Sequence, residues 1–168
     1  TYEEIVYEGY GPAGAAVMVE CLTDNRNRTA AEIRHIFSKN GGNLGESGCV
    51  AYIFERKGVL ILKANETDEE TLLMQMLEAG AEDIQVDEDA VEVQTAPEDY
   101  EQVRQAAEDY GYEIIEGEVM MVPSTTVTLD GDDAEKMVKL YEALEDNDDV
   151  QNIYTNVDLD HLAQFTNF

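Results

Sequence analysis

The chain has 168 residues, of which 43% are hydrophobic, and this content supports one large domain or two small ones rather than a disordered chain. No apolar run approaches the length of a membrane span, and the first residues have neither the basic start nor the apolar middle of a signal peptide. We therefore expect a cytoplasmic protein without membrane contact. The net charge of −28 repels a nucleic-acid backbone from most of the surface.

The first elements expected along the chain are a strand, a helix and a second strand. Residues 15–22 (AAVMVECL) predict a buried strand. Thr29 with Glu32 three residues later fits a capping box at the start of a helix, and the pair Gly41 and Gly42 fits the end of that helix. Residues 49–55 (CVAYIFE) predict the next strand.

The helix between these strands has two unlike sides. At about 100° per residue, Ala30, Ile33 and Phe37 fall together on one side. The opposite side carries polar and charged residues, namely Arg28, Glu32, His35 and Lys39. The apolar side is expected to pack against a sheet, which leaves the charged side free to bind.

From Gly58 the pattern restarts. The expected elements are a strand at 59–64, a helix at 66–80 ended by Gly80, a hairpin at 82–96, a helix at 98–111 after Pro97 and a strand at 112–123. This β-α-β-β-α-β order is the ferredoxin-like split motif.

The last part of the chain supplies a strand at 125–130, a helix at 132–147 and a strand at 150–158. Together with the elements at 15–55 these would complete a second, similar sandwich. We therefore expect an α+β fold of two ferredoxin-like α/β sandwich domains, in which residues 57–124 are inserted into a domain formed by 1–56 and 125–168.

The residues that could support catalysis or metal binding are few. Cys21 and Cys49 lie in apolar, strand-like runs, which favours buried reduced thiols over a disulfide. His35 and His161 are the only histidines, and no serine lies in a nucleophile-elbow pattern. The acidic runs 130–133 and 145–149 do not complete a calcium loop. We expect no enzyme, no metal and no cofactor.

Two glycine-rich stretches resemble phosphate-binding loops. Gly9–Gly14 matches G-x-G-x-x-G, but it leads into a strand rather than a helix and Pro12 removes one amide, so we interpret it as a flexible entry loop. Residues 40–48 lack the Gly-Lys-Ser/Thr ending, and Glu46 would repel phosphates. A long turn with Leu44 in the core is the favoured interpretation, although contact with a nucleic-acid backbone stays open.

Basic residues are concentrated in one part of the sequence. Seven of the ten lie between Arg26 and Lys63, whereas residues 57–128 hold 19 acidic and three basic residues. Arginine at loop and helix-start positions presents a planar fork suited to phosphate oxygens or to stacking on bases. The alternative is that these cations form salt bridges with the acidic inserted domain.

The stretch YEGYGPAGAAVMVECLTDNRNRTAAEIRHIFSKNGGNLGESGCVAYIFERKG, residues 7–58, resembles the signature of the YebC family, which includes the mitochondrial translational activator of cytochrome c oxidase subunit one. The resemblance implies three domains, of which a basic, helical amino-terminal domain is absent from this sequence. It also implies a non-enzymatic regulator of gene expression, in the cytoplasm for a bacterial member and in the mitochondrion for a eukaryotic one.

The partners implied by the resemblance are the ribosome and RNA, or DNA, reached mainly through that amino-terminal domain together with region 24–48. The candidate contact residues are Asn25, Arg26, Arg28, Arg34, His35, Lys39, Asn40, Gly41 and Gly42. A translation factor on ribosomal or transfer RNA is the leading hypothesis, since a body with this charge is poorly suited to lie along a duplex. The alternatives are a DNA-binding transcriptional regulator and a small-molecule sensor.

Overall fold

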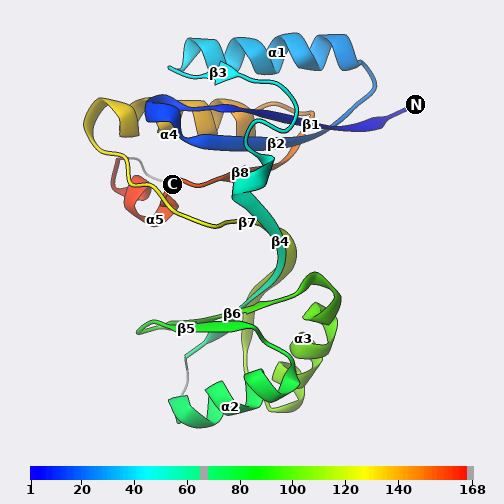
Figure 1. Cartoon of the computed structure of the whole chain (residues 1–168), viewed down its shortest axis with the longest axis vertical. Helices are drawn as coiled ribbons and strands as arrows, with labels where there is room; N and C mark the ends of the chain where they lie inside the picture. The colour runs from blue at the N-terminus through cyan, green and yellow to red at the C-terminus, as the bar shows by residue number, and fades with distance from the viewer. Residues whose placement is uncertain (65–67, 166–168) are drawn as a thin grey trace. The chain divides into compact units, whose positions relative to one another are not determined.

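The computed structural model describes residues 1–64 and 68–165. The chain forms two compact units, one comprising Thr1–Glu55 with Pro123–Phe168 and the other comprising Arg56–Val122. We call these unit 1 and unit 2. Each has its own four-stranded sheet (Figure 1). The fold is α+β, as the sequence predicts.

Unit 1 is built on a sheet with strand order β3-β1-β2-β8, in which all neighbouring strands are antiparallel. Its strands are β1 (Glu3–Tyr10), β2 (Ala16–Thr23), β3 (Asn43–Leu44) and β8 (Val150–Thr155). Its helices are α1 (Arg26–Lys39), α4 (Gly131–Glu145) and the short α5 (Leu159–Leu162). Alternate residues of β2 bury their side chains in the core that α1 and α4 share, because successive strand residues point to opposite faces.

Unit 2 has the strand order β5-β6-β4-β7. Its strands are β4 (Phe54–Lys63), which begins in unit 1, β5 (Asp83–Val86), β6 (Ala90–Thr95) and β7 (Ile114–Pro123). Its helices are α2 (Glu69–Ala79) and α3 (Tyr100–Asp109). The β-α-β-β-α-β order confirms the predicted motif. Helix α2 ends at Gly80, which has φ +121°, as expected, whereas the expected start of this helix at Glu66 lies outside the described residues.

Two strands predicted for unit 1 are wrong. Residues 49–53 form a turn and a short 3-10 helix, Ala51–Ile53, because their amides are bound by another part of the chain, described below. Residues 125–130 make a single parallel bridge, Val127 with Val157, instead of a strand. The strands that complete this sheet are β1 and β3. The acidic strand β1 was not predicted, and the loop expected at Gly9–Gly14 overlaps it only at Gly9 and Tyr10; Pro12–Gly14 form a short 3-10 helix.

Within the described residues, no helix is both long enough and apolar enough to cross a membrane.

Candidate nucleic-acid interface

Helix α1 presents one buried side and one exposed side. Thr29, Ile33 and Phe37 are buried against the sheet. The five cationic candidates, Arg26, Arg28, Arg34, His35 and Lys39, are all exposed. Of the flanking candidates, Asn25 and Gly41 are exposed, and Asn40 and Gly42 are half-buried. The structure therefore brings the candidate residues to one helix and its two ends.

The helix begins four residues earlier than a capping box at Thr29 would place it, so that prediction is wrong. Asn25 is the N-cap, and its side-chain oxygen accepts a hydrogen bond from the Arg28 amide at 3.1 Å. Thr29 lies in the first turn, where it is fully buried. Its hydroxyl lies 2.7 Å from the Thr23 hydroxyl and 2.8 Å from the Asp149 carboxylate, so it binds across the fold instead of capping the helix.

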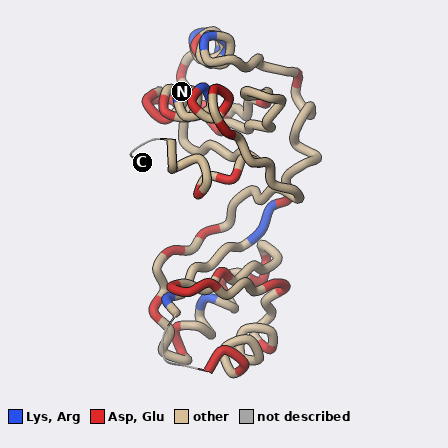
Figure 2. The backbone as a smooth tube through the Cα atoms, turned by 90° about the vertical axis from the view of Figure 1, so that its left-hand side faces the viewer, with Lys and Arg blue, Asp and Glu red and all other residues tan. Residues whose placement is uncertain are grey.

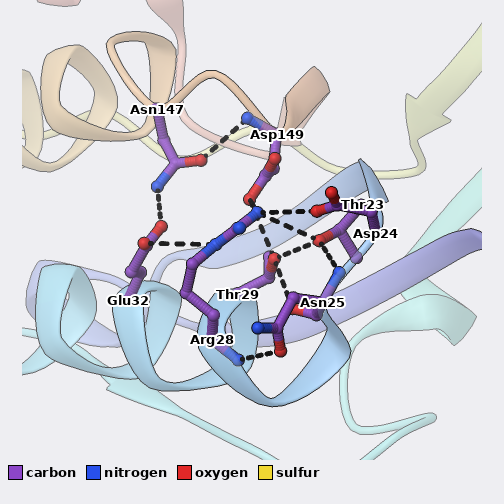
Figure 3. Close-up of polar contacts among 8 residues, drawn as sticks. All are labelled: Thr23, Asp24, Asn25, Arg28, Thr29, Glu32, Asn147 and Asp149. Carbon is purple, nitrogen blue, oxygen red and sulfur yellow. Dashed lines mark hydrogen bonds and ion pairs between the residues drawn. The ribbon is translucent and has the colours of Figure 1, made fainter. Parts of the chain in front are cut away.

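Arg28 is held by three carboxylates (Figure 3). Its Nη2 lies 2.9 Å from Asp149 Oδ2 and 3.4 Å from Asp24 Oδ1, and its Nε lies 3.6 Å from Glu32 Oε1. The hydrogen bond from Arg28 lowers the pKa of Asp149 below its ordinary value, and the bond from Thr29 acts in the same direction against the effect of burial. The same bond to Asp149 raises the pKa of Arg28.

The carboxylates around Arg28 belong to unit 1, not to the inserted acidic segment. Asp149 lies in the turn between α4 and β8, at the end of the acidic run 145–149. Asn147 in the same turn donates to Glu32 at 2.8 Å and accepts from the Asp149 amide at 2.9 Å (Figure 3). The acidic run therefore contacts the start of α1, and the Arg28 side chain is largely paired within the protein.

The other cations of α1 differ from Arg28. Among the described residues, Arg26, Arg34 and Lys39 make no ion pair, and His35 has no recorded hydrogen-bond partner. Acidic residues are spread along the backbone, whereas Lys and Arg occupy few stretches, α1 among them (Figure 2). The exposed side of α1 is thus a local cationic surface, which we call the α1 face and define by Arg26, Arg34, His35 and Lys39.

The loop after α1 is organised by a carboxylate from β1. Glu8 is 6% exposed, and its two oxygens accept hydrogen bonds from the amides of Gly48 (2.6 Å), Val50 (3.1 Å) and Ala51 (2.7 Å). Three converging amides are the arrangement expected of an anion-binding loop. Here the anion is the protein's own, so these amides are not available to a phosphate. Leu44 packs against the core, as expected.

The described residues contain no group of three or more His, Cys, Asp or Glu side chains placed to hold a metal ion. Cys21 and Cys49 are free, and burial raises the pKa of the Cys21 thiol to about 11, which disfavours a nucleophilic thiolate. His161 lies 2.7 Å from Asp130, the residue that precedes α4. What this surface offers chemically is charge, not an activated group.

Comparisons with known proteins give one consistent result. Residues 2–157 match the family described as the TACO1/YebC second and third domain. Similar curated proteins include one from Pelotomaculum thermopropionicum (58% identical, 95% of this chain, 66% of the relative) and one from Dictyoglomus turgidum (58%, 97% and 66%), both named "probable transcriptional regulatory protein". A solved structure of a conserved hypothetical protein from Aquifex aeolicus is 47% identical and matches with a TM-score of 0.79 over 94% of this chain and 65% of that one. The chain thus spans just under two thirds of the length of these relatives.

Proposed function

The chain belongs to the TACO1/YebC family, and from this premise we propose that it is a non-enzymatic regulator of gene expression that acts in translation by contacting ribosomal or transfer RNA. The surface proposed to make the contact is the α1 face with its two ends, residues 25–42. Its role is to position the protein through phosphate oxygens, not to read bases.

The observation that carries this proposal is the set of unpaired cations on α1. In a chain with a net charge of −28, carboxylates are abundant, yet Arg26, Arg34 and Lys39 make no ion pair with any described residue. Arg26 lies in the first turn of α1, where the helix dipole disfavours a positive charge. A cation that costs stability and has no ion-pair partner among the described residues is best explained by an external anion.

Arg28 has a different role in this proposal. Its contacts with Asp149, Asp24 and Glu32 fix the start of α1 against the turn that follows α4. It therefore positions the α1 face, and its side chain is only partly available to RNA. Asn25 likewise acts mainly as the N-cap. Asn40 donates from its side chain to the Ile36 carbonyl at 2.8 Å, so it closes the other end of the helix.

The charge distribution favours RNA over a DNA duplex. A duplex presents phosphates along its whole length, so a protein lying along it would place carboxylates against them. A structured RNA presents local phosphate clusters, single strands and 2′-hydroxyls, which a small cationic surface can contact while the acidic remainder stays away. The relatives' names favour the alternative, a DNA-binding transcriptional regulator.

The two units are, we infer, two domains, with residues 57–124 inserted into a domain made of 1–56 and 125–168. The separate hydrophobic cores of the two units support this inference. The relatives known from these comparisons are bacterial, which supports a cytoplasmic location.

Titration of the chain by fluorescence anisotropy against a transfer RNA, a ribosomal RNA hairpin and a DNA duplex, each over a salt series, tests the proposal. We expect RNA to bind more tightly than the duplex at physiological salt. The Arg34→Ala/Lys39→Ala variant should lower the slope of log K against log salt by about 0.7 to 0.9 for each lost phosphate contact.

The matched control is Arg56→Ala/Lys63→Ala, which removes the same charge from unit 2. It should leave the slope near that of the wild type. If both double variants weaken binding equally, the interaction is nonspecific attraction and the α1 face has no special role. Tight, sequence-dependent duplex binding would favour the DNA alternative, and co-sedimentation with ribosomes would favour translation.

A further inference from the structure

The turn that ends α1 lies against α4. The first two turns of α4 place Lys136, which is exposed, beside Gly41. A Cβ built on Gly41 would lie 3.1 Å from Lys136 Cδ and 3.8 Å from its Cβ, so the lysine stem lies over this glycine. Gly41 has φ +82°, a conformation that glycine adopts without strain. The turn is therefore open enough to seat a side chain from a second helix.

Two cations from different helices are thus brought to one turn. Lys39 ends α1 two residues before Gly41, and Lys136 reaches the same glycine from α4. Neither lysine makes an ion pair with a described residue, although Asp132 precedes Lys136 by one helical turn on α4. Two lysines at the same turn, neither ion-paired with a described residue, raise the local potential there more than either would alone.

Capping of α1 does not by itself account for Lys136. The Ile36 carbonyl accepts from the Asn40 side chain (2.8 Å), and the Phe37 carbonyl accepts from the amides of Asn40 (3.2 Å) and Gly42 (2.9 Å). The Ile36 and Phe37 carbonyls therefore have partners, and a lysine is not needed to satisfy these two. The helix dipole still favours a cation here, so a purely stabilising role must be tested separately.

We propose that Lys39, Lys136 and the Gly41 turn form one phosphate-binding site, which extends the α1 face onto α4. Its ligand is a phosphodiester of RNA, so this inference rests on the proposed function. The two ammonium groups would contact the phosphate oxygens, and the absence of a side chain at Gly41 lets the Lys136 stem lie across the turn. Lys136 lies 97 residues after Lys39, so no local motif could reveal the pair.

The experiment compares Lys136→Ala with Lys139→Ala in the salt-series anisotropy titration with a transfer RNA. Lys139 is exposed and lies three residues further along α4, which makes it a matched control. We expect Lys136→Ala to lower the slope of log K against log salt by about 0.7 to 0.9, as Lys39→Ala does, and Lys139→Ala to leave it unchanged. Lys136→Arg should restore the wild-type slope, because it keeps the charge.

The outcomes separate the two proposals. If the wild-type chain binds RNA and Lys39→Ala lowers the slope while Lys136→Ala does not, the two-helix site is wrong and the proposed function stands. If Lys136→Ala lowers only the melting temperature, Lys136 stabilises the end of α1, and the site is again wrong. If the wild-type chain binds no RNA, the proposed function is wrong and the site is lost with it.

Discussion

Replacing Glu8 by glutamine tests how the loop after α1 is held. The Glu8 carboxylate accepts three backbone amide hydrogen bonds, two at Oε1 from Val50 and Ala51 and one at Oε2 from Gly48. The Glu8→Gln variant has nearly the same shape, but its amide nitrogen must replace one of the two oxygens. If the amide nitrogen takes the position of Oε1, two backbone amides are left without an acceptor. If it takes the position of Oε2, one backbone amide is left without an acceptor.

The magnitude follows from the less costly placement. Hydrogen bonds to a charged group contribute about 1.5 to 3 kcal/mol each and those between neutral groups about 0.5 to 1.5 kcal/mol. One bond of about 1.5 to 3 kcal/mol is then lost and two are weakened by about 1 kcal/mol each, so the loop should lose about 4 kcal/mol of stability. Since about 1.4 kcal/mol is a factor of ten, the amides of Val50 and Ala51 should exchange with solvent about a thousandfold faster.

Amide hydrogen exchange followed by NMR measures this directly, residue by residue. Glu4→Gln is the control, because Glu4 lies on the same strand and the same side of it but is exposed. It should change stability by no more than about 0.5 kcal/mol. If Val50 and Ala51 exchange at the wild-type rate in Glu8→Gln, the carboxylate does not hold this loop, and the reasoning about its amides fails.

Three further predictions concern other features. Arg28 lowers the pKa of Asp149, so the stabilising charge of the Asp149 carboxylate is present above the ordinary value of 3.8 and is lost as the pH falls through the lowered value. Asp149→Asn should therefore be less stable than the wild type in urea at pH 7. Equal stability of the two proteins there would contradict this. Gly41→Ala should lower the melting temperature more than Gly48→Ala, because both have positive φ but only Gly41 has Lys136 beside it. Iodoacetamide at pH 8 should leave Cys21 unmodified in the folded chain while it modifies the half-buried Cys49, as mass spectrometry would report.

Unit 2 was largely predictable from sequence because its signals are local. Its inward strand residues Leu60, Leu62, Val91 and Val93 recur at every second position, and Gly80 and Pro97 mark helix boundaries. A period-two pattern with one apolar face predicts a strand and also indicates which face of that strand is buried. The order of elements then leaves few topologies to choose between, so the fold class could be inferred.

Unit 1 was less predictable because its strands are defined by distant partners. Residues 49–53 have the composition of a strand, but Glu8, some 40 residues earlier, takes up the amides that a strand would pair. Strand β1 carries Glu3, Glu4 and Glu8, so its pattern looked like exposed polar chain. In both cases hydrogen bonds to residues distant in the sequence override the strand or loop preference of the local sequence.

The candidate interface shows the same division. The helix, its buried face and its glycine end follow from spacing and could be predicted. The difference between Arg28 and its neighbours could not, because the partner that decides it, Asp149, lies 121 residues away. An unexplained acidic run at the end of α4 was the one sequence signal that pointed to such a partner.

The α1 face is longer than the distance over which its charges interact in salt solution. This length decides whether the contributions of its cations to binding add. Arg26 and Lys39 are 13 residues apart, so at about 1.5 Å per residue they lie about 20 Å apart along the helix. The Debye length at physiological salt is about 8 Å, so the two charges are screened from each other and should contact separate phosphates. The losses in binding free energy for Arg26→Ala and Lys39→Ala should then add in the double variant to within about 0.5 kcal/mol. Lys39 and Lys136 are proposed to share one phosphate, so their losses in binding free energy should not add. If Arg26 and Lys39 instead prove as strongly coupled as Lys39 and Lys136, the two ends of the helix do not contact separate phosphates. The division of the surface into separate contacts is then wrong.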